Sequence, residues 1–332
     1  MTRVKVNFTL QPMETQNLIV TARVEVAQGI VEWTLADPQG KPLVGYHAGA
    51  HVDVFMAPQL ARSYSLTQPS AGAPTPHYVM AVALAPDSRG GSAHMHQHVQ
   101  VGSMVQVGMP RNLFPMVDSD APVLLIAGGI GITPLLAMVR ERQAQGRGWR
   151  LVLAARSSRH AAYVDQLQAM PGLLQTHFDD EHGGQPLDVH AVMSRLDPKT
   201  HVYCCGPKPL MDKVMEVGLA VGHPVTHLHF ESFGGAEPAP QEGDQPFVVE
   251  LARSGTEVQV PVGVSILDAL EGAGVIVPSV CREGSCGSCE CMVLGGEVDH
   301  RDQILSEQER QANKSLMICV SRAKGERLRL DV

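Results

Sequence analysis

The feature that most constrains this chain is a group of closely spaced cysteines near its C-terminus. The segment VPSVCREGSCGSCECMV contains three cysteines at the spacing C-x4-C-x2-C, and a fourth follows in LMICVSR. This spacing is typical of a plant-type 2Fe-2S cluster. Glycines and serines between the cysteines let the backbone wrap closely around a compact group and direct amide N–H groups at the sulfurs. The predicted ligands are Cys281, Cys286, Cys289 and Cys319.

A zinc site and a set of disulfides are the alternatives for these cysteines. Zinc usually takes two separated C-x2-C pairs, which differs from the spacing here. The chain has seven cysteines, and the assignment of four to a cluster favours a reducing compartment. The first ten residues, MTRVKVNFTL, lack the apolar core and the small-residue cleavage site of an export signal. We therefore expect a cytoplasmic protein.

Charge and hydropathy argue against two classes of partner. The formal net charge is -8 and the chain has no run of Lys or Arg, so nucleic acid is not an expected partner. Residues 121–139 are uncharged and have nearly the length of a membrane span. Three glycines and Pro134 interrupt them and predict a strand, a turn and a helix instead. No membrane association is expected, and 332 residues suffice for two or three domains.

Residues 1–115 have the pattern of an antiparallel β-barrel or sandwich. Strands are expected at 18–27, 29–38, 51–57, 62–68, 77–85 and 104–110. Turn sequences such as DPQGKP and PSAGAPTP separate them. Alternation places Arg62 and Tyr64 on one face of a strand, with Ser63 and Ser65 on the other. A cation, an aromatic ring and a hydroxyl this close together suit a phosphate, a flat ring and a ring heteroatom.

A second motif, Arg89-Gly90-Gly91-Ser92, precedes an expected helix at 93–99. Such a turn offers backbone N–H groups and a hydroxyl to a phosphate, and the helix dipole assists. An ordinary loop is the alternative. His94, His96 and His98 raise a metal site as another alternative, but 96 does not share the helical face of 94 and 98, and no carboxylate stands at ligand spacing. We expect a solvated helix surface there.

Residues 116–233 alternate between strands and helices, which is typical of a doubly wound parallel sheet. Strands are expected at 123–127, 149–156, 174–178, 201–205 and 226–230, with helices at 133–143, 160–169, 187–196 and 209–221. The first strand runs into GGIGITP at 128–134. Its glycines let a diphosphate approach the backbone, and its Thr-Pro pair starts a helix well. A tight turn without a ligand is the alternative.

The carboxyl ends of these strands are where ligands of such sheets bind. Cys204-Cys205-Gly206-Pro207 ends the fourth strand, and Glu231 and Phe233 follow the fifth. Cys205 is therefore expected beside a reacting nicotinamide, as a polarisable packing surface rather than a nucleophile. A buried cysteine with a packing role alone is equally consistent with the sequence.

The remaining chain has the pattern of a linker and a third domain. Residues 234–246 are rich in Gly, Pro and acid and are expected to be a linker. Residues 247–332 suit a β-grasp ferredoxin domain. Its expected parts are a strand pair from Phe247, an amphipathic helix with Ile266, Leu267 and Leu270 on one face, the cysteine loop, a short helix at 305–312 and a final strand around Cys319.

The motifs R-x-Y-S, G-G-S, G-G-I-G-I-T-P and C-G-P, followed by the cysteine motif, resemble the phthalate dioxygenase reductase family. These are the reductases of two-component Rieske oxygenases. The resemblance covers essentially the whole chain, and a cluster domain in last place is its most specific feature. It implies an FMN-binding β-barrel at 1–115, an NAD-binding α/β domain at 116–233 and a C-terminal 2Fe-2S domain. Relatives with FAD carry a longer motif for the adenosine diphosphate half, whereas G-G-S stands alone here.

By position, the resemblance also assigns site residues. The FMN phosphate would take Arg62, Gly90, Gly91 and Ser92, the isoalloxazine would pack on Tyr64, and its N5 edge would bond Ser65. The dinucleotide would take Gly128, Gly129, Gly131 and Thr133, with the nicotinamide against Cys205, Gly206 and Pro207, and Glu231 and Phe233 would border the flavin's other face. The candidate catalytic residues are Ser65, Cys205 and Glu231.

Electron counting connects the three domains. NADH gives up two electrons as a hydride, a 2Fe-2S cluster accepts one, and flavin handles both. The expected path is NADH to FMN to the cluster to a terminal oxygenase that docks near the cluster domain, and we expect a monomer. A cytochrome P450 or another hydroxylase is an alternative acceptor. A redox sensor and an electron carrier with a degenerate reductase half are further alternatives, which the intact motifs at 62–65 and 128–134 disfavour.

The choice between NADH and NADPH is less direct. The second strand of NAD-specific sheets usually ends in an acid that holds the ribose hydroxyls. Here it ends in Ala155-Arg156-Ser157-Ser158-Arg159, which by itself would allow a 2′-phosphate. The resemblance favours NADH.

Overall fold

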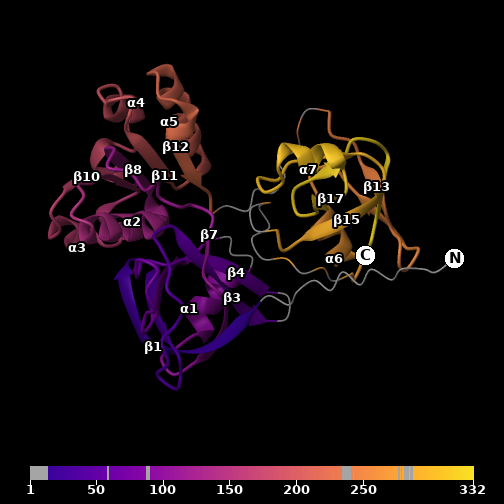
Figure 1. Ribbon diagram of the computed structural model, residues 1–332, viewed down its shortest axis with the longest axis horizontal. Coiled ribbons are helices and arrows are strands. Elements are labelled where there is room, and N and C mark those ends of the chain that lie inside the picture. Colours follow the sequence, from indigo (N-terminus) through magenta and orange to yellow (C-terminus); the bar gives the residue numbers. More distant parts are fainter. Residues whose placement is uncertain are drawn as a thin grey trace.

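The computed structural model describes residues 14–57, 60–86, 90–233, 241, 243–275, 277, 279, 284 and 287–332. Figure 1 shows a β-barrel, an α/β domain and a C-terminal β-rich domain, in that order along the chain. Arg89 and the predicted ligands Cys281 and Cys286 lie outside the described residues. Within the described part of the chain, none of the helices is both long enough and apolar enough to cross a bilayer.

The first domain is an antiparallel β-barrel, as predicted. Its strands follow the order β4-β3-β6-β1-β2-β5, and β7 pairs with β3. An isolated bridge between Leu66 and Met80 joins the two ends of that order, so the sheet closes. The elements are β1 Thr15–Ala27, β2 Ile30–Ala36, β3 Ala50–Ala57, β4 Leu60–Ser65, β5 Tyr78–Ala83, α1 Gly91–His98, β6 Met104–Gly108 and β7 Arg111–Asn112.

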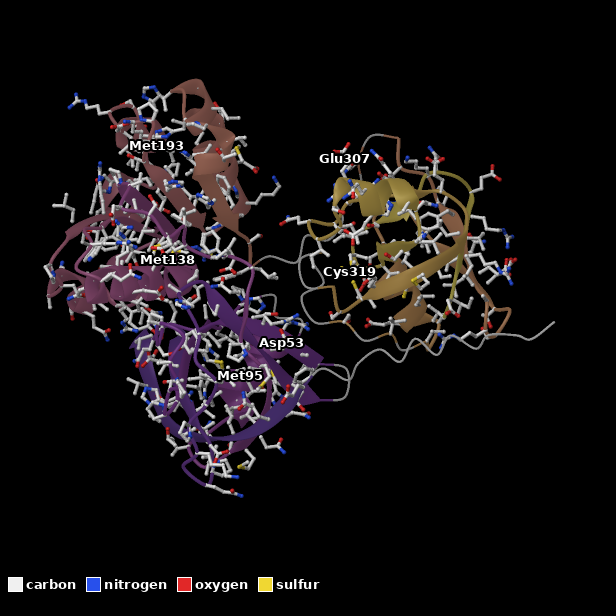
Figure 2. All side chains as sticks on the ribbon, viewed as in Figure 1. Asp53, Met95, Met138, Met193, Glu307 and Cys319 are labelled. Atoms are coloured by element: carbon white, nitrogen blue, oxygen red, sulfur yellow. The ribbon has the colours of Figure 1, made fainter. Side chains whose placement is uncertain are left out.

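Apolar side chains fill this barrel, including the fully buried Trp33 and Met95. Met95 comes from α1 and lies inside the barrel domain in Figure 2. His96 differs from the expected solvated surface of α1. It is half-buried, its Nε2 lies 2.9 Å from the Val82 carbonyl oxygen, and its ring meets Trp33 edge-on. It does so because the helix rests against the barrel and places position 96 on the covered side.

The second domain is a five-stranded parallel sheet in the order β10-β9-β8-β11-β12. The strands are β8 Val123–Gly128, β9 Arg150–Ala155, β10 Leu173–Phe178, β11 His201–Cys205 and β12 Leu228–Glu231, and the helices are α2 Ile132–Ala144, α3 Val164–Gln168, α4 Val189–Met193 and α5 Lys208–Ala220. The uncharged stretch 121–139 therefore forms β8, a turn and half of α2, as predicted. Figure 1 shows helices on both faces of the sheet.

Two predicted helices are shorter than expected, and the stretch 187–196 forms a helix only at Val189–Met193. The stretch 160–169 forms a helix only from Val164, because Tyr163 has a left-handed backbone with φ 66° that ends the preceding turn. Sequence periodicity carries no sign of such a residue, since its conformation depends on a tertiary contact. The Tyr163 hydroxyl donates to Glu32 of the barrel at 2.8 Å.

The barrel and the α/β domain share a hydrophobic core. Ile30, Ala48 and Ala81 of the barrel belong to the same buried cluster as α2 and the strands β8, β9 and β11. Met138 of α2 lies inside this region in Figure 2. Because the apolar side chains of both domains exclude water together, the barrel and the α/β domain are packed as one unit.

The third domain has a sheet in the order β14-β13-β19-β15-β17, with β13 and β19 parallel. Its elements are β13 Phe247–Leu251, β14 Glu257–Val260, α6 Ile266–Gly272, β15 Glu290–Gly295, β16 Val298–Asp299, α7 Glu307–Ala312, β17 Ser315–Met317, β18 Arg322–Ala323 and β19 Arg327–Leu330. Ile266, Leu267 and Leu270 are buried, as the helical pattern predicted. The expected final strand around Cys319 is wrong: Cys319 lies in a turn after β17, and β19 is the final strand.

The end of the predicted linker packs on this third domain. Arg301 donates two hydrogen bonds to the Asp244 carboxylate, at 3.2 and 2.5 Å. The buried Arg322 donates to the carbonyl oxygens of Gln245, Pro261 and Val264. These bonds compensate the burial of both guanidinium groups and tie residues 244 and 245 to the C-terminal domain.

Candidate functional site

The three predicted catalytic residues come together where the barrel meets the α/β domain. Ser65 is the last residue of β4, and its hydroxyl donates to a Glu231 carboxylate oxygen at 3.5 Å. Glu231 ends β12 and pairs in register with Cys205, which ends β11. We call this group of Ser65, Cys205 and Glu231 the junction.

Burial governs the chemistry of the junction. It raises the pKa of the Glu231 carboxyl to about 8, and the Ser65 hydroxyl lowers that pKa by a smaller amount. Glu231 is therefore mostly uncharged at neutral pH. Cys205 is fully buried, as is the neighbouring Cys204, whose thiol pKa burial raises to about 12. A thiol of that kind packs and does not act as a nucleophile.

The predicted flavin residues lie beside the junction on the barrel. Gly90 has φ 91°, and a Cβ on Gly91 would stand 2.6 Å from Cγ of Arg62. The G-G-S turn and the R-x-Y-S strand are therefore in contact, although they are far apart in the sequence. Ser92 lies in the first turn of α1, where its hydroxyl accepts a hydrogen bond from the Ala85 amide at 3.2 Å. Arg62 and the start of α1 together make a positive, donor-rich site.

Tyr64 carries a buried hydroxyl with no hydrogen-bond partner among the described residues. Burial raises its pKa to about 12, while the charge of Arg62 opposes the rise. A buried hydroxyl without a partner is costly, so it marks a place for a ligand group. A flavin with a polar ring edge and a phosphate fits Tyr64, Arg62 and the glycine turn.

The glycines of the predicted nucleotide turn have two different functions. A Cβ on Gly128 would meet Pro207 at 2.6 Å, and one on Gly131 would meet the Cys205 carbonyl oxygen at 2.1 Å. These two glycines let the ends of β8 and β11 pack closely. Gly129 has φ 55°, and a Cβ added to it would have no described heavy atom within 4 Å. That surface leaves room for a diphosphate on the backbone.

The other predicted nucleotide residues differ in exposure. Thr133 is 1% exposed and donates its hydroxyl to the Ile130 carbonyl oxygen at 3.0 Å, so this hydroxyl closes the turn. Gly206 packs against Gly128, where an added Cβ would stand 2.8 Å from its Cα. Pro207 is exposed at the start of α5, and Phe233 is 40% exposed after β12. Pro207 and Phe233 therefore offer apolar surface near the junction.

Two of the four predicted metal ligands are described, and they are neighbours. The Sγ atoms of Cys289 and Cys319 lie 3.1 Å apart, beyond the length of about 2.05 Å of a disulfide. Both residues are 2% exposed, and the Gly284 amide donates to the Cys319 sulfur at 3.2 Å. Buried thiolates that accept a backbone N–H fit the ligands of an iron–sulfur cluster. Cys291, on β15, lies outside the cysteine motif and is also buried.

The sequence interpretation missed a polar contact between the first two domains. Arg140 and Glu141, adjacent on α2, hydrogen-bond to Thr67 and Ala48 of the barrel. Their signal was present, since Arg140-Glu141-Arg142 interrupts an apolar helix in which charges need buried partners. Sequence reasoning has no means to tell which surface supplies these partners, because the barrel and the helix meet only after folding.

Comparison with known proteins is decisive for the family. Residues 249–324 match the model of the 2Fe-2S iron-sulfur cluster binding domain, and residues 125–216 match that of the oxidoreductase NAD-binding domain. Phthalate dioxygenase reductase of Burkholderia cepacia is 39% identical over 319 residues, which cover 95% of this chain and 97% of that protein. The chain belongs to the phthalate dioxygenase reductase family.

Other relatives of this family serve different oxygenase systems. Vanillate O-demethylase oxidoreductase of a Pseudomonas species is 38% identical, with 95% of this chain and 99% of that protein covered. The carnitine monooxygenase reductase subunit of Escherichia coli is 39% identical, with 92% and 95% covered. A solved structure of phthalate dioxygenase reductase is similar to this chain, with a TM-score of 0.72 and 38% identity. The match covers 96% of this chain and 98% of the solved one, which is described as a modular structure for electron transfer from pyridine nucleotides to [2Fe-2S].

The membership confirms the predicted chemistry of the chain. It is an NADH-dependent oxidoreductase, the reductase component of an oxygenase system. Its cofactors are NADH, FMN and a 2Fe-2S cluster, and its partner is an oxygenase. The zinc and disulfide alternatives are wrong, since the cysteine loop lies inside the 2Fe-2S domain match.

Proposed function

We propose that hydride transfer from NADH takes place at the junction of Ser65, Cys205 and Glu231. The observation that carries this proposal is the contact between a barrel residue and a sheet residue: Ser65 and Glu231 meet at 3.5 Å. A flavin held by the barrel and a nicotinamide held at the strand ends would face each other only there. Hydride transfer depends on this orientation more than on a general acid or base. When bound, FMN accepts two electrons and passes them on one at a time.

The junction residues have distinct roles in this proposal. The Ser65 hydroxyl lies at the flavin's N5 edge and orients the ring. Cys205 supplies a buried, polarisable surface for the nicotinamide. Glu231, uncharged at neutral pH because burial raises its pKa to about 8, borders the reacting rings without placing a negative charge beside them.

Stopped-flow reduction of the flavin by NADH tests these roles. Replacing Ser65 with Ala, Cys205 with Ala or Glu231 with Gln should each slow flavin reduction by about 10-fold or more, since orientation is lost. Cys204→Ala is the matched control, because Cys204 is equally buried but faces the other side of β11. Wild-type rates in all three variants would rule out the junction as the site of transfer.

The proposal extends to the residues that hold the two cofactors. Arg62, Gly90, Gly91 and Ser92 bind the FMN phosphate, and Tyr64 packs on the flavin ring. The dinucleotide would cross the open face of Gly129 in the turn 128–133, Gly206 and Pro207 would border the nicotinamide, and Phe233 would border the flavin's other face. Arg62→Ala should release FMN on dilution, measured by flavin fluorescence in the filtrate. Mass spectrometry of that flavin distinguishes FMN from FAD.

The ribose end of the nucleotide site lies at the end of β9. Arg156 is exposed there, and its carbonyl oxygen accepts a hydrogen bond from the Asp180 amide at 3.1 Å. The backbone of the exposed Asp180 thus lies beside that of Arg156, and an acidic residue in this region disfavours a 2′-phosphate, which supports NADH. We expect a higher kcat/KM for NADH than for NADPH. An equal or higher value for NADPH would identify Arg156 as a phosphate-binding residue.

Cys281, Cys286, Cys289 and Cys319 ligate the cluster in this proposal, and the terminal oxygenase is of the Rieske type and docks near the cluster domain. We propose a monomer in the cytoplasm. Light scattering tests the oligomeric state. Cross-linking to a Rieske oxygenase, followed by peptide mapping, tests the docking: peptides from residues 287–332 support it, and peptides from the barrel alone contradict it.

A cytochrome P450 is the second candidate acceptor. An intact type IV self-sufficient cytochrome P450 monooxygenase contains a part similar to this chain, with 35% identity, a TM-score of 0.75 and coverage of 96% of this chain and 41% of that one. The same electron path thus suits a haem acceptor. Comparing the rates at which the reduced chain reduces a Rieske oxygenase and a P450 haem domain separates the two candidates.

A further inference from the structure

Two adjacent residues of α2 connect the nucleotide domain to the barrel. An Nη of Arg140 donates to the Thr67 carbonyl oxygen at 2.8 Å. The Glu141 carboxylate accepts from the Ala48 amide at 2.7 Å and lies 3.1 Å from Nδ1 of His47. We call these contacts the seam.

The seam is buried on the side of Glu141, whereas Arg140 is half-buried and the His47 side chain is 62% exposed. Glu141 is 8% exposed. Its barrel partner Ala48 is 2% exposed, and Thr67, the barrel partner of Arg140, is fully buried. A charged side chain in such surroundings is stable only with its hydrogen-bond partners in place. A displacement of the two domains would break the bond from the Ala48 amide to the Glu141 carboxylate and the bond from Arg140 to the Thr67 carbonyl oxygen, although Arg140 would keep its bond to Gln166 of its own domain.

The barrel side of the seam is next to the junction. Thr67 stands two residues after Ser65, and its amide donates to the Val79 carbonyl oxygen at 2.8 Å. The Leu66 amide donates to the Ala50 carbonyl oxygen at 2.8 Å, so the segment of Ala48 and the segment of Thr67 lie side by side. Arg140 therefore contacts the chain just after β4, the strand that ends in Ser65. Glu141 contacts the chain just before β3, the neighbour of β4 in the sheet.

The other side of the seam is the helix that follows the nucleotide turn. α2 begins at Ile132, directly after the turn at 128–131, and a helix is a stiff element over two turns. In Figure 1, α2 lies on the side of the α/β domain next to the barrel. The seam thus fixes the turn that holds the dinucleotide relative to the strand that faces the flavin.

We propose that Arg140 and Glu141 are positioning residues for hydride transfer. They set the distance and angle between the two reacting rings without touching either of them. This inference rests on the proposed transfer at the junction. Because reaction rates fall steeply when reacting atoms are misplaced by about 1 Å, loss of the seam slows the transfer itself.

The test is single-turnover reduction of the flavin in the holoprotein, with NADH and with NADH deuterated at the transferred position. Arg140→Met and Glu141→Leu should each slow flavin reduction by about 10- to 100-fold and raise the isotope effect, because the transfer becomes more fully rate-limiting. Arg140→Lys keeps a charged donor and should recover part of the rate. Flavin content and the dissociation constant of NADH should stay near wild-type values.

Arg142→Met is the matched control. Arg142 stands on the same helix and is 3% exposed, but its guanidinium donates to Gly148 and Ala121 within the nucleotide domain. This variant should lower the melting temperature while the folded protein reduces its flavin at the wild-type rate. The variant therefore distinguishes an effect of lower stability on the rate of flavin reduction from an effect of misplaced domains.

Each other outcome overturns the inference. Wild-type rates in Arg140→Met and Glu141→Leu would exclude a positioning role, and so would a weaker affinity for NADH with an unchanged limiting rate. A rate loss in Arg142→Met as large as in Arg140→Met would assign the effect to stability. If wild-type flavin is not reduced by NADH, the proposed function fails, and this inference fails with it.

Discussion

The barrel and the α/β domain share one hydrophobic core, whereas the ferredoxin domain has its own. Ile30 and Ala48 of the barrel are packed with α2 and the parallel sheet in a single cluster. The core of the ferredoxin domain is built from residues between Phe247 and Leu330, and it includes the proposed ligands Cys289 and Cys319. The seam of Arg140 and Glu141 adds buried polar contacts to the first pair only.

The difference matches the chemistry of the two electron transfers. A hydride moves as an atom with its electrons, so donor and acceptor rings need a fixed contact, which a shared core provides. A single electron passes from flavin to cluster with no bond made or broken. The two transfers therefore place different demands on packing, and the following predictions test whether the two parts behave as separately as their cores suggest.

The largest effect is expected from the ligand cysteines. Cys289→Ser and Cys319→Ser should remove or badly destabilise the cluster, since each loses a thiolate ligand. The visible absorption of the cluster and the reduction of cytochrome c should then collapse. Flavin content and NADH–ferricyanide activity should largely survive, because the flavin and nicotinamide sites lie in other domains.

Cys291→Ala is the control for that experiment. Cys291 is buried on β15 near Cys289, so its replacement should cost about 1–3 kcal/mol of stability and keep the cluster. Loss of the cluster in Cys291→Ala, with retention in Cys289→Ser, would reassign the ligand. Loss of NADH–ferricyanide activity in the ligand variants would show that the two parts depend on each other.

Removal of the ferredoxin domain should have the next largest effect. A chain that ends at Gly235 keeps the whole shared core, so it should fold, bind FMN and reduce ferricyanide with NADH. Its reduction of cytochrome c should be inefficient, because the cluster is absent. An insoluble or flavin-free product would place the domain boundary elsewhere.

Core substitutions sharpen the comparison by calorimetry. Phe114 is 3% exposed and packs edge-on against Tyr203, with ring centroids 5.7 Å apart. Phe114→Ala should destabilise the barrel and the α/β domain together by about 3–5 kcal/mol, in one transition. Leu270→Ala should lower only the ferredoxin transition, by about 2–5 kcal/mol. Separate transitions for the barrel and the α/β domain would contradict the shared core.

The smallest effect concerns pH. Glu231 has a pKa of about 8 in the folded protein and the ordinary value of 4.5 when unfolded, so the folded state binds its proton more tightly. Its contribution to stability is complete below pH 4.5 and is lost as the pH rises through 8. Between pH 6 and 9 the melting temperature should fall by about 5–10 °C more in wild type than in Glu231→Gln. Equal pH profiles would mean that this carboxyl is already ionised at pH 6.

Most of the candidate site could be predicted from short local motifs in the sequence. The C-x4-C-x2-C spacing indicated the cluster, and R-x-Y-S, G-G-S and the glycine turn indicated the residues proposed here to bind the other cofactors. Such motifs are readable because a compact ligand requires fixed residue types at short spacing. The three domains were predictable for a similar reason, since the periods of strands and helices are local properties of the chain.

The tertiary structure alone decided which motifs meet. Ser65 and Glu231 are separated by 166 positions, and only the packing of the barrel on the sheet brings them to 3.5 Å. The partners of Arg140 and Glu141 and the contact of Tyr163 with Glu32 depend on the same packing, and the covered face of His96 depends on the packing of α1 within the barrel domain. A charged or aromatic side chain has no partner encoded beside it in the sequence, because burial and hydrogen bonding depend on surfaces that meet only after folding.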